Sequence, residues 1–314
     1  MSGPVEAKDL EDSERSGTTN GVASQLMESR VAQVGSMPVK RALPNRGRRT
    51  VGAWCFADLF GPANIDGRFS PDIGPHPHLG LQTVTWLTAG ELVHHDSLGS
   101  EQLIRPGQLN LMTAGHGVAH AEESTDSYRG PIHGVQLWVA QPSSTRDGPP
   151  AFEHHPQLPR LDIGNSTATL LVGELDGTAS PARRDSDHFG VDLELRSGDT
   201  AVPLQPAFEH ALLVTDGTAI HQGQPVTPGL LLYLGTGRDE LDLRCPEPSR
   251  ALLLGGVPFG EQLLMWWNFV ARTRPEVDTA YEDWTADSGR FGRVRSRLAR
   301  IEASRPPWWQ PTAP

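Results

Sequence analysis

The chain has 314 residues, among them 33 glycines and 27 prolines, and a formal net charge of −11. This acidity argues against a phosphate-binding surface, and so against direct binding of nucleic acid. No eighteen apolar residues run together and the first residues form no apolar leader, so we expect a soluble, cytoplasmic protein without membrane contact. Cys55 and Cys245 lack metal-binding spacing and are expected to be buried thiols in a reducing compartment, with a disulfide as the alternative.

The first half of the chain predicts many short strands. Residues 1–35 are rich in small and acidic residues, and we expect a disordered or loosely attached N-terminal arm there. Strand-forming segments then recur between turns of Gly and Pro, with no helical stretch among them. They lie at 51–58, 81–87, 91–96, 102–104, 109–112, 118–122 and 132–140. The pattern predicts a first β-barrel over residues 36–145.

Two pairs of polar residues share a spacing of two within this barrel. They are His76 and His78, separated by a proline, and His120 and Glu122, separated by an alanine. Side chains alternate between the faces of a strand, so the members of each pair project to the same side. If both strands lie together in one barrel and both pairs face inward, the four side chains converge. The sequence therefore predicts a metal site of three imidazoles and one carboxylate.

This ligand set suits Fe, Mn, Co, Ni, Cu or Zn and disfavours Ca and Mg. Four protein ligands leave two octahedral positions for a chelating substrate, dioxygen or both, whereas a closed tetrahedral zinc site is the structural alternative. The other histidines of this region are expected to support the ligands, line the pocket or lie at the surface. They are His94, His95, His116 and His133.

The second half predicts a repeat of the same design. Residues 141–160 contain five prolines and predict a linker between barrels. Strand segments then predict a second barrel over residues 160–295, with turns that echo those of the first. This barrel has neither a His-x-His nor a His-x-Glu pair, so we expect no metal in it. His210 and His221 are interpreted as core or surface histidines.

The C-terminal part predicts two helices. A capping box at Thr273 and Glu276 begins a helix that we expect to run to Trp284. Apolar residues at helical spacing among arginines then predict a helix packed along a barrel, with a basic partner-binding helix as the alternative. Those residues are Phe291, Val294, Leu298 and Ile301. Residues 296–314 form a tail, whose pair of tryptophans at 308 and 309 is expected to pack on a neighbouring surface.

Four segments give the chain a specific resemblance to the pirin family of the cupin superfamily. Residues 76–85 read HPHLGLQTVT, where the family has roughly HPHRGFETVT. Residues 112–122 read MTAGHGVAHAE, where the family has MTAGxGxxHSE. The segments 54–61 and 265–272 also resemble the family, and the resemblance extends over about residues 36–295.

The resemblance implies an all-β fold of two cupin barrels packed face to face, with a short C-terminal helical segment. It also implies a metal, usually iron and here expected as Fe(II), held by His76, His78, His120 and Glu122.

Two positions depart from the family pattern. Leu79 replaces the usual Arg, which would remove a charge beside the pocket mouth and change substrate or partner preference. Gln82 stands where many cupins carry a carboxylate, so Glu122 would have to act as the base.

The family resemblance implies two classes of function. In the first, the protein is a dioxygenase that cleaves a flavonol such as quercetin, and Glu122 accepts the proton of the flavonol hydroxyl. In the second, it is a non-enzymatic, redox-sensing iron protein that binds a transcription factor or metabolic enzyme. The loss of the arginine at Leu79 favours the enzyme. A metal-stabilised scaffold without activity is a third alternative, and a monomer is expected because two fused barrels already cover each other's faces.

Overall fold

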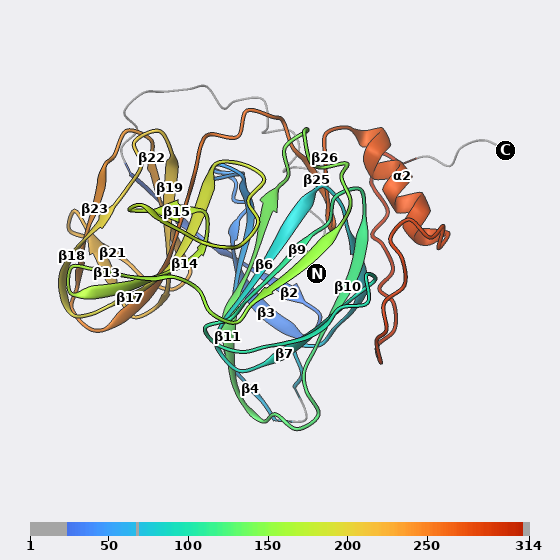
Figure 1. Cartoon of the computed structure of the whole chain (residues 1–314), viewed down its shortest axis with the longest axis horizontal. Helices are drawn as coiled ribbons and strands as arrows, with labels where there is room; N and C mark the ends of the chain where they lie inside the picture. The colour runs from blue at the N-terminus through green and yellow to red at the C-terminus, as the bar shows by residue number, and fades with distance from the viewer. Residues whose placement is uncertain (1–23, 67–68, 310–314) are drawn as a thin grey trace.

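Two β-barrels lie side by side in the computed structural model, which describes residues 24–66 and 69–309 (Figure 1). The predicted all-β fold is confirmed, and the described residues contain one helix, α2 (Arg274–Thr285), at the outer side of the first barrel. No helix within these residues has the length and apolarity that a membrane span requires.

The first barrel is built from a seven-stranded and a four-stranded sheet. The large sheet has the order β12-β9-β6-β11-β4-β3-β2 and the small one the order β5-β10-β7-β8. The large sheet contains β2 (Arg30–Val34), β3 (Met37–Leu43), β4 (Trp54–Ile65), β6 (Leu81–Ala89), β9 (Leu109–Thr113), β11 (Gly130–Ala140) and β12 (Ala151–His155). The small sheet contains β5 (Ile73–His78), β7 (Leu92–Asp96), β8 (Glu101–Ile104) and β10 (Val118–Glu123).

The second barrel repeats this plan. Its large sheet has the order β1-β22-β19-β24-β17-β14-β13 and its small sheet the order β18-β23-β20-β21. The large sheet contains β1 (Gln25–Glu28), β13 (Arg160–Ile163), β14 (Ser166–Val172), β17 (His188–Leu195), β19 (Glu209–Asp216), β22 (Leu230–Gly235) and β24 (Ser249–Gly256). The small sheet contains β18 (Gly198–Pro203), β20 (Ala219–His221), β21 (Gln224–Val226) and β23 (Glu240–Cys245). Two short hairpins complete the fold: β15 (Glu174–Leu175) with β16 (Thr178–Ala179), and β25 (Leu264–Trp266) with β26 (Phe269–Ala271).

The two large sheets pack against each other through one apolar cluster, which confirms the predicted face-to-face arrangement. Trp86 of the first barrel and Leu252 of the second both belong to this cluster. Trp54 is fully buried, and its indole N–H lies 3.0 Å from the carbonyl oxygen of Phe189 and 3.2 Å from that of Gly255. The interface therefore combines apolar burial with a polar contact between the barrels.

Alternation along β11 separates this interface from the interior of the first barrel. Val135 and Leu137 lie in the apolar cluster between the barrels. Gln136 and Trp138 project to the opposite face and line a cavity inside the first barrel. The strand that binds the barrels together thus also forms a wall of the candidate site.

The prediction of a disordered or loosely attached N-terminal arm over residues 1–35 is wrong for residues 25–34, which form strands. Residues 1–23 lie outside the described residues, but β1 and β2 fall within the expected arm. β1 pairs with β22 of the second barrel and β2 pairs with β3 of the first. Leu26 and Met27 pack on the apolar clusters, and this burial offsets the entropy lost when the segment is ordered.

The linker expected between the barrels also contains a strand. β12 lies within residues 141–160 and pairs with β9, so the first barrel extends beyond residue 145 to His155. Phe152 of β12 stacks on the ring of His94, with the ring centroids 4.3 Å apart. The prolines flank this strand and do not interrupt it, so proline content alone overestimated the length of the linker.

The helix predicted from Thr273 is confirmed as α2. Thr273 is its N-cap, but the predicted capping box does not form: the Thr273 side chain caps no backbone N–H and instead donates to the Glu276 carboxylate at 3.1 Å, which also accepts from the N–H of Arg272. The tail tryptophans pack as expected, because the ring of Trp308 lies 5.5 Å from that of Trp266.

The second helix, predicted over Phe291–Ile301, is wrong. Residues 289–309, here called the C-terminal strap, contain no helix and run across strands of the first barrel. The carbonyl oxygen of Phe291 accepts a hydrogen bond from the N–H of Ala119, and the N–H of Ile301 donates to the carbonyl oxygen of Pro75, each at 2.9 Å. These two backbone groups of the C-terminal strap are therefore paired with β10 and with the edge strand β5, instead of within a helix.

Candidate metal centre

Strands β5 and β10 position the candidate ligands. The two strands are antiparallel neighbours, and His120 lies directly opposite His76 in their register. His78 lies two residues further along β5 and so projects to the same face. Pro75 and Pro77 alternate with these histidines, which β5 tolerates because it forms the edge of its sheet.

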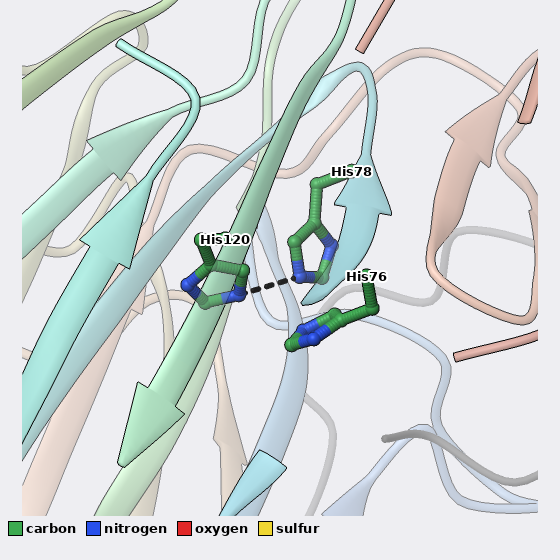
Figure 2. Close-up of side chains that lie close together, drawn as sticks. All are labelled: His76, His78 and His120. Atoms are coloured by element: carbon green, nitrogen blue, oxygen red, sulfur yellow. Dashed lines mark hydrogen bonds between the residues drawn. The ribbon is translucent and has the colours of Figure 1, made fainter. Parts of the chain in front are cut away.

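Three imidazoles converge at this point. One nitrogen from each of His76, His78 and His120 lies within 4.8 Å of the other two, and we call these side chains the three-histidine group. Figure 2 shows the rings directed toward one another, with the two Nε2 atoms of His78 and His120 at 3.1 Å. All three are buried, at 4%, 1% and 1% exposure. Among the described residues, no second group of metal-ligating side chains is this compact.

Glu122 lies beside the three-histidine group without joining it. A register shift between His120 and Glu122 breaks the regular pairing of β10 with β5. The carboxylate lines the same cavity and accepts a hydrogen bond of 3.2 Å from the hydroxyl of Thr85. Burial raises the pKa of Glu122, while His94 and the Thr85 hydrogen bond lower it in part. Its role as a fourth ligand therefore stays a prediction.

Burial lowers the pKa of each imidazole in the three-histidine group, because a buried site disfavours the charged form. The pKa of His78 falls to about 3, although its hydrogen bond to the carbonyl of Asn268 acts in the opposite direction. The pKa values of His76 and His120 lie well below the usual range, and the neighbouring histidines lower them further. The group is therefore neutral at physiological pH and can offer lone pairs to a cation.

Backbone carbonyls orient two of the rings. The Nδ1 of His76 lies 2.9 Å from the carbonyl oxygen of Gly74, and the Nδ1 of His78 lies 3.1 Å from that of Asn268. A carbonyl oxygen can only accept, so we assign the proton of each ring to Nδ1, which leaves Nε2 free to bind a metal. Three neutral nitrogen donors with a carboxylate nearby fit a divalent transition metal.

A cavity in the first barrel contains these side chains. Its space not occupied by atoms measures about 580 Å³, including the part open to solvent. The lining combines apolar and aromatic side chains with nearly as many polar and charged ones, which include the three-histidine group and Glu122. The apolar lining residues include Met37, Val39, Phe56, Phe60 and Trp138, and the polar ones include Asp58, Thr85 and Gln136.

An aromatic stack forms one wall of this cavity. The rings of Phe56 and Trp138 are stacked with centroids 4.0 Å apart, and Trp138 meets His78 edge-on at 5.1 Å. The guanidinium of Arg41 lies 4.4 Å from the other ring centroid, that of Phe56. It also forms two hydrogen bonds to Asp58, at 2.8 and 2.7 Å. Arg41 and Trp138 thus cover the two faces of Phe56, and Trp138 is the ring of this stack that lies against His78, where it can contact a planar aromatic ligand.

Two residues singled out by the sequence lie away from the cavity. Leu79 was expected at the pocket mouth, but it is buried in an apolar cluster with Trp266 and Phe269. An arginine there would have to bury its charge, so apolar packing explains the leucine. Gln82 is fully buried and donates a hydrogen bond to Thr113, and it does not line the cavity.

Of the other four histidines in this region, one contacts the three-histidine group and three do not. His94 touches His120, with their Nδ1 atoms 3.4 Å apart, whereas His95 and His133 are half-buried and His116 is exposed. Sequence reasoning missed Asp96, which binds His94 at 3.2 Å. The signal was present as a third pair with a spacing of two, on strand β7 next to β10.

Comparisons with known proteins identify one family across both barrels. Residues 36–139 match the family model described as Pirin, and residues 190–292 match the one described as Pirin C-terminal cupin domain. A Pseudomonas aeruginosa protein named "Putative quercetin 2,3-dioxygenase PA1205" is 44% identical over 311 residues, which cover 98% of each chain. A pirin-like protein of Caulobacter vibrioides is 35% identical, over 83% of this chain and 92% of its own length.

Solved structures agree with these relatives. A crystal structure of quercetin 2,3-dioxygenase from Acinetobacter baumannii has a TM-score of 0.88 and 42% identity, covering 92% of this chain and 97% of that one. The nickel(II) complex of the Escherichia coli pirin YhhW shares the fold at a TM-score of 0.61 and 17% identity, covering 75% of this chain and 100% of that one.

Proposed function

The chain belongs to the pirin family, and on that premise we propose that it is an Fe(II)-dependent dioxygenase that opens the heterocycle of a flavonol such as quercetin. His76, His78, His120 and Glu122 hold the metal in this proposal. When bound, the metal supplies the Lewis acidity and redox capacity that ring opening with dioxygen requires.

One observation carries the proposal: the three-histidine group faces a cavity whose wall is a flat aromatic stack. Trp138 and the edge of Phe56 form the surface against which a planar bicyclic substrate packs, with its hydroxyl directed at the histidines. A surface-read redox switch is supported less well, because the ligand side chains are at most 6% exposed.

Glu122 has the properties of a base for the substrate hydroxyl. It lies in the same cavity as the three-histidine group, and its raised pKa makes its carboxylate a better proton acceptor than an exposed one. The hydroxyl of Thr85 lies 3.2 Å from one carboxylate oxygen and 2.9 Å from the amide oxygen of Gln136, and the second carboxylate oxygen is left for the proton. The bound flavonol then reacts as its anion, and each turnover takes up one dioxygen and releases one carbon monoxide.

The experiment is oxygen uptake and carbon monoxide release by protein that has been loaded with Fe(II) under anaerobic conditions and then mixed with quercetin and air. We expect equal amounts of oxygen consumed and carbon monoxide released. Glu122→Gln should lower the rate by at least about 100-fold, the usual contribution of a general base. Glu123→Gln is the matched control, since Glu123 binds Arg297 and does not line the cavity. Loaded protein that turns over no quercetin, or full activity in Glu122→Gln, would contradict the proposal.

A further inference from the structure

His120 is oriented differently from the other two members of the three-histidine group. His76 and His78 contact backbone carbonyls, whereas the Nδ1 of His120 lies 3.4 Å from the Nδ1 of another histidine, His94. The Nε2 of His94 lies in turn 3.2 Å from a carboxylate oxygen of Asp96. The orientation of His120 therefore depends on two side chains of the neighbouring strand β7.

The proton positions along the hydrogen-bonded series from Asp96 through His94 to His120 follow from Asp96. The carboxylate of Asp96 can only accept, so His94 carries its proton on Nε2. A neutral imidazole has a single N–H, which makes the Nδ1 of His94 an acceptor. His120 must then donate from Nδ1, and its Nε2 keeps a lone pair. The Nε2 atoms of His120 and His78, 3.1 Å apart, thus face each other as two lone pairs with no proton between them. A cation bound to both nitrogens would stabilise this arrangement.

Both supporting side chains are held firmly. The second carboxylate oxygen of Asp96 accepts hydrogen bonds from the backbone N–H groups of Leu98 and Ser100, each at 2.9 Å. The ring of His94 is buried and stacks on Phe152, with the ring planes 12° apart. Neither side chain can turn without the loss of these contacts.

We propose that His94 and Asp96 are positioning residues, which hold His120 in the one tautomer that can bind a metal through Nε2. The proposal predicts an unusual effect of Asp96→Asn. The N–H groups of Leu98 and Ser100 would retain the amide oxygen, so the amide NH₂ would face His94. His94 would then carry its proton on Nδ1, and His120 would be driven to the tautomer with the proton on Nε2.

The direct test needs no metal. Long-range proton–nitrogen NMR of metal-free protein with ¹⁵N-labelled histidine, at about pH 8 where imidazoles are neutral, distinguishes the two tautomers. The native protein should show His76, His78 and His120 protonated on Nδ1. Asp96→Asn should move His120 to the Nε2 form and leave His76 and His78 unchanged. An unchanged tautomer of His120 in Asp96→Asn would overturn the proposal.

A second measurement links the tautomer to metal binding, and this part rests on the ligand role proposed above for His120. Competition with a chelator for Co(II) should show affinity reduced by about 10- to 100-fold in Asp96→Asn and in His94→Phe, which keeps the stack on Phe152. Asp72→Asn is the control, because Asp72 also accepts a backbone N–H, that of Ser124, but contacts none of the three histidines. A tautomer that switches while affinity stays constant would support the positioning chain and contradict the ligand role of His120.

Discussion

The buried ion pair of Arg41 and Asp58 shows what single residues contribute to this cavity. The two side chains are at most 3% exposed and form a bidentate pair, of which Asp58 lines the cavity. Such a pair adds little net stability over apolar packing, but the loss of one partner leaves a buried charge uncompensated. The pair therefore fixes the position of Phe56, over which the guanidinium lies.

Asp58→Asn should lower the free energy of unfolding by about 3–5 kcal/mol, because the guanidinium of Arg41 stays buried beside a neutral amide. Urea denaturation measures this change. Asp287→Asn is the matched control, since Asp287 binds Arg293 at the surface with side-chain exposures of 42% and 86%, and should cost no more than about 1 kcal/mol. Equal losses in the two variants would contradict this account of the pair.

Residue-scale reasoning predicted the histidine pairs but not their surroundings. The spacing of His76 with His78, and of His120 with Glu122, fixes which side chains share a face of each strand. It does not reveal which strands are neighbours, and the contact of His94 with His120 depends on the pairing of β7 with β10. Leu79 was misplaced for the same reason, since its surroundings come from the distant hairpin β25–β26.

At the scale of elements, the C-terminal strap supports the strands that carry the histidines. Its hydrogen bonds reach Pro75 and Ala119, the residues that precede His76 and His120. Arg297 of the strap forms ion pairs with three carboxylates of the first barrel. They belong to Asp72, Glu123 and Asp126. Without the strap, these like charges would lie uncompensated beside β5 and β10.

Arg297→Ala should destabilise the protein modestly, by up to about 1 kcal/mol at low salt, because the side chain is 42% exposed and solvent screens its charge. The loss should shrink at high ionic strength. Urea denaturation at two salt concentrations measures both effects, with Arg293→Ala as the control, since Arg293 is 86% exposed and forms a single ion pair among the described residues, with Asp287. A loss independent of salt would show that Arg297 acts through packing instead.

The errors of sequence reasoning at this scale concern segments that complete sheet edges. The spacing of Phe291 and Ile301 fits a helix, yet both residues lie in a non-helical segment and hydrogen-bond through their backbone to strands of the first barrel. β1 and β12 were assigned to an arm and a linker because their short sequences carry little periodic signal. An edge that needs a partner is a property of the folded sheet, which local propensity does not encode.

At the scale of the molecule, the two barrels share a plan but differ inside. Both were predicted from the recurrence of short strands, and the large sheets pack face to face through Trp54 and its neighbours. The second barrel has an interior filled by aliphatic and aromatic side chains. Two histidines are nevertheless fully buried, His210 beside the rings of Phe189 and Phe208 and His188 against Trp54 of the first barrel, and burial lowers the pKa of each to about 4.

These two histidines predict a loss of stability in mild acid. In the unfolded chain they take up protons below about pH 6.5, whereas the folded protein keeps them neutral until about pH 4. These two histidines therefore do not reduce the free energy of unfolding above pH 6.5. As the pH falls from 6.5 towards 4, each lowers the free energy of unfolding by roughly 3 kcal/mol. Thermal unfolding across this range should show His210→Phe with a flatter profile than the native protein, and His116→Gln, at an exposed position, is the control. If the unfolding temperature depended on pH equally in all three proteins, the role assigned to His210 would be contradicted.

The central claim is that His76, His78 and His120 form a metal centre in the first barrel. The most direct test is to load the protein with Fe(II) under anaerobic conditions, remove unbound metal and measure iron per chain. We predict close to one iron in the native protein, and less than a tenth of that amount in His76→Ala and in His120→Ala. Native protein that retains no metal, or histidine variants that retain as much as the native protein, would contradict the account.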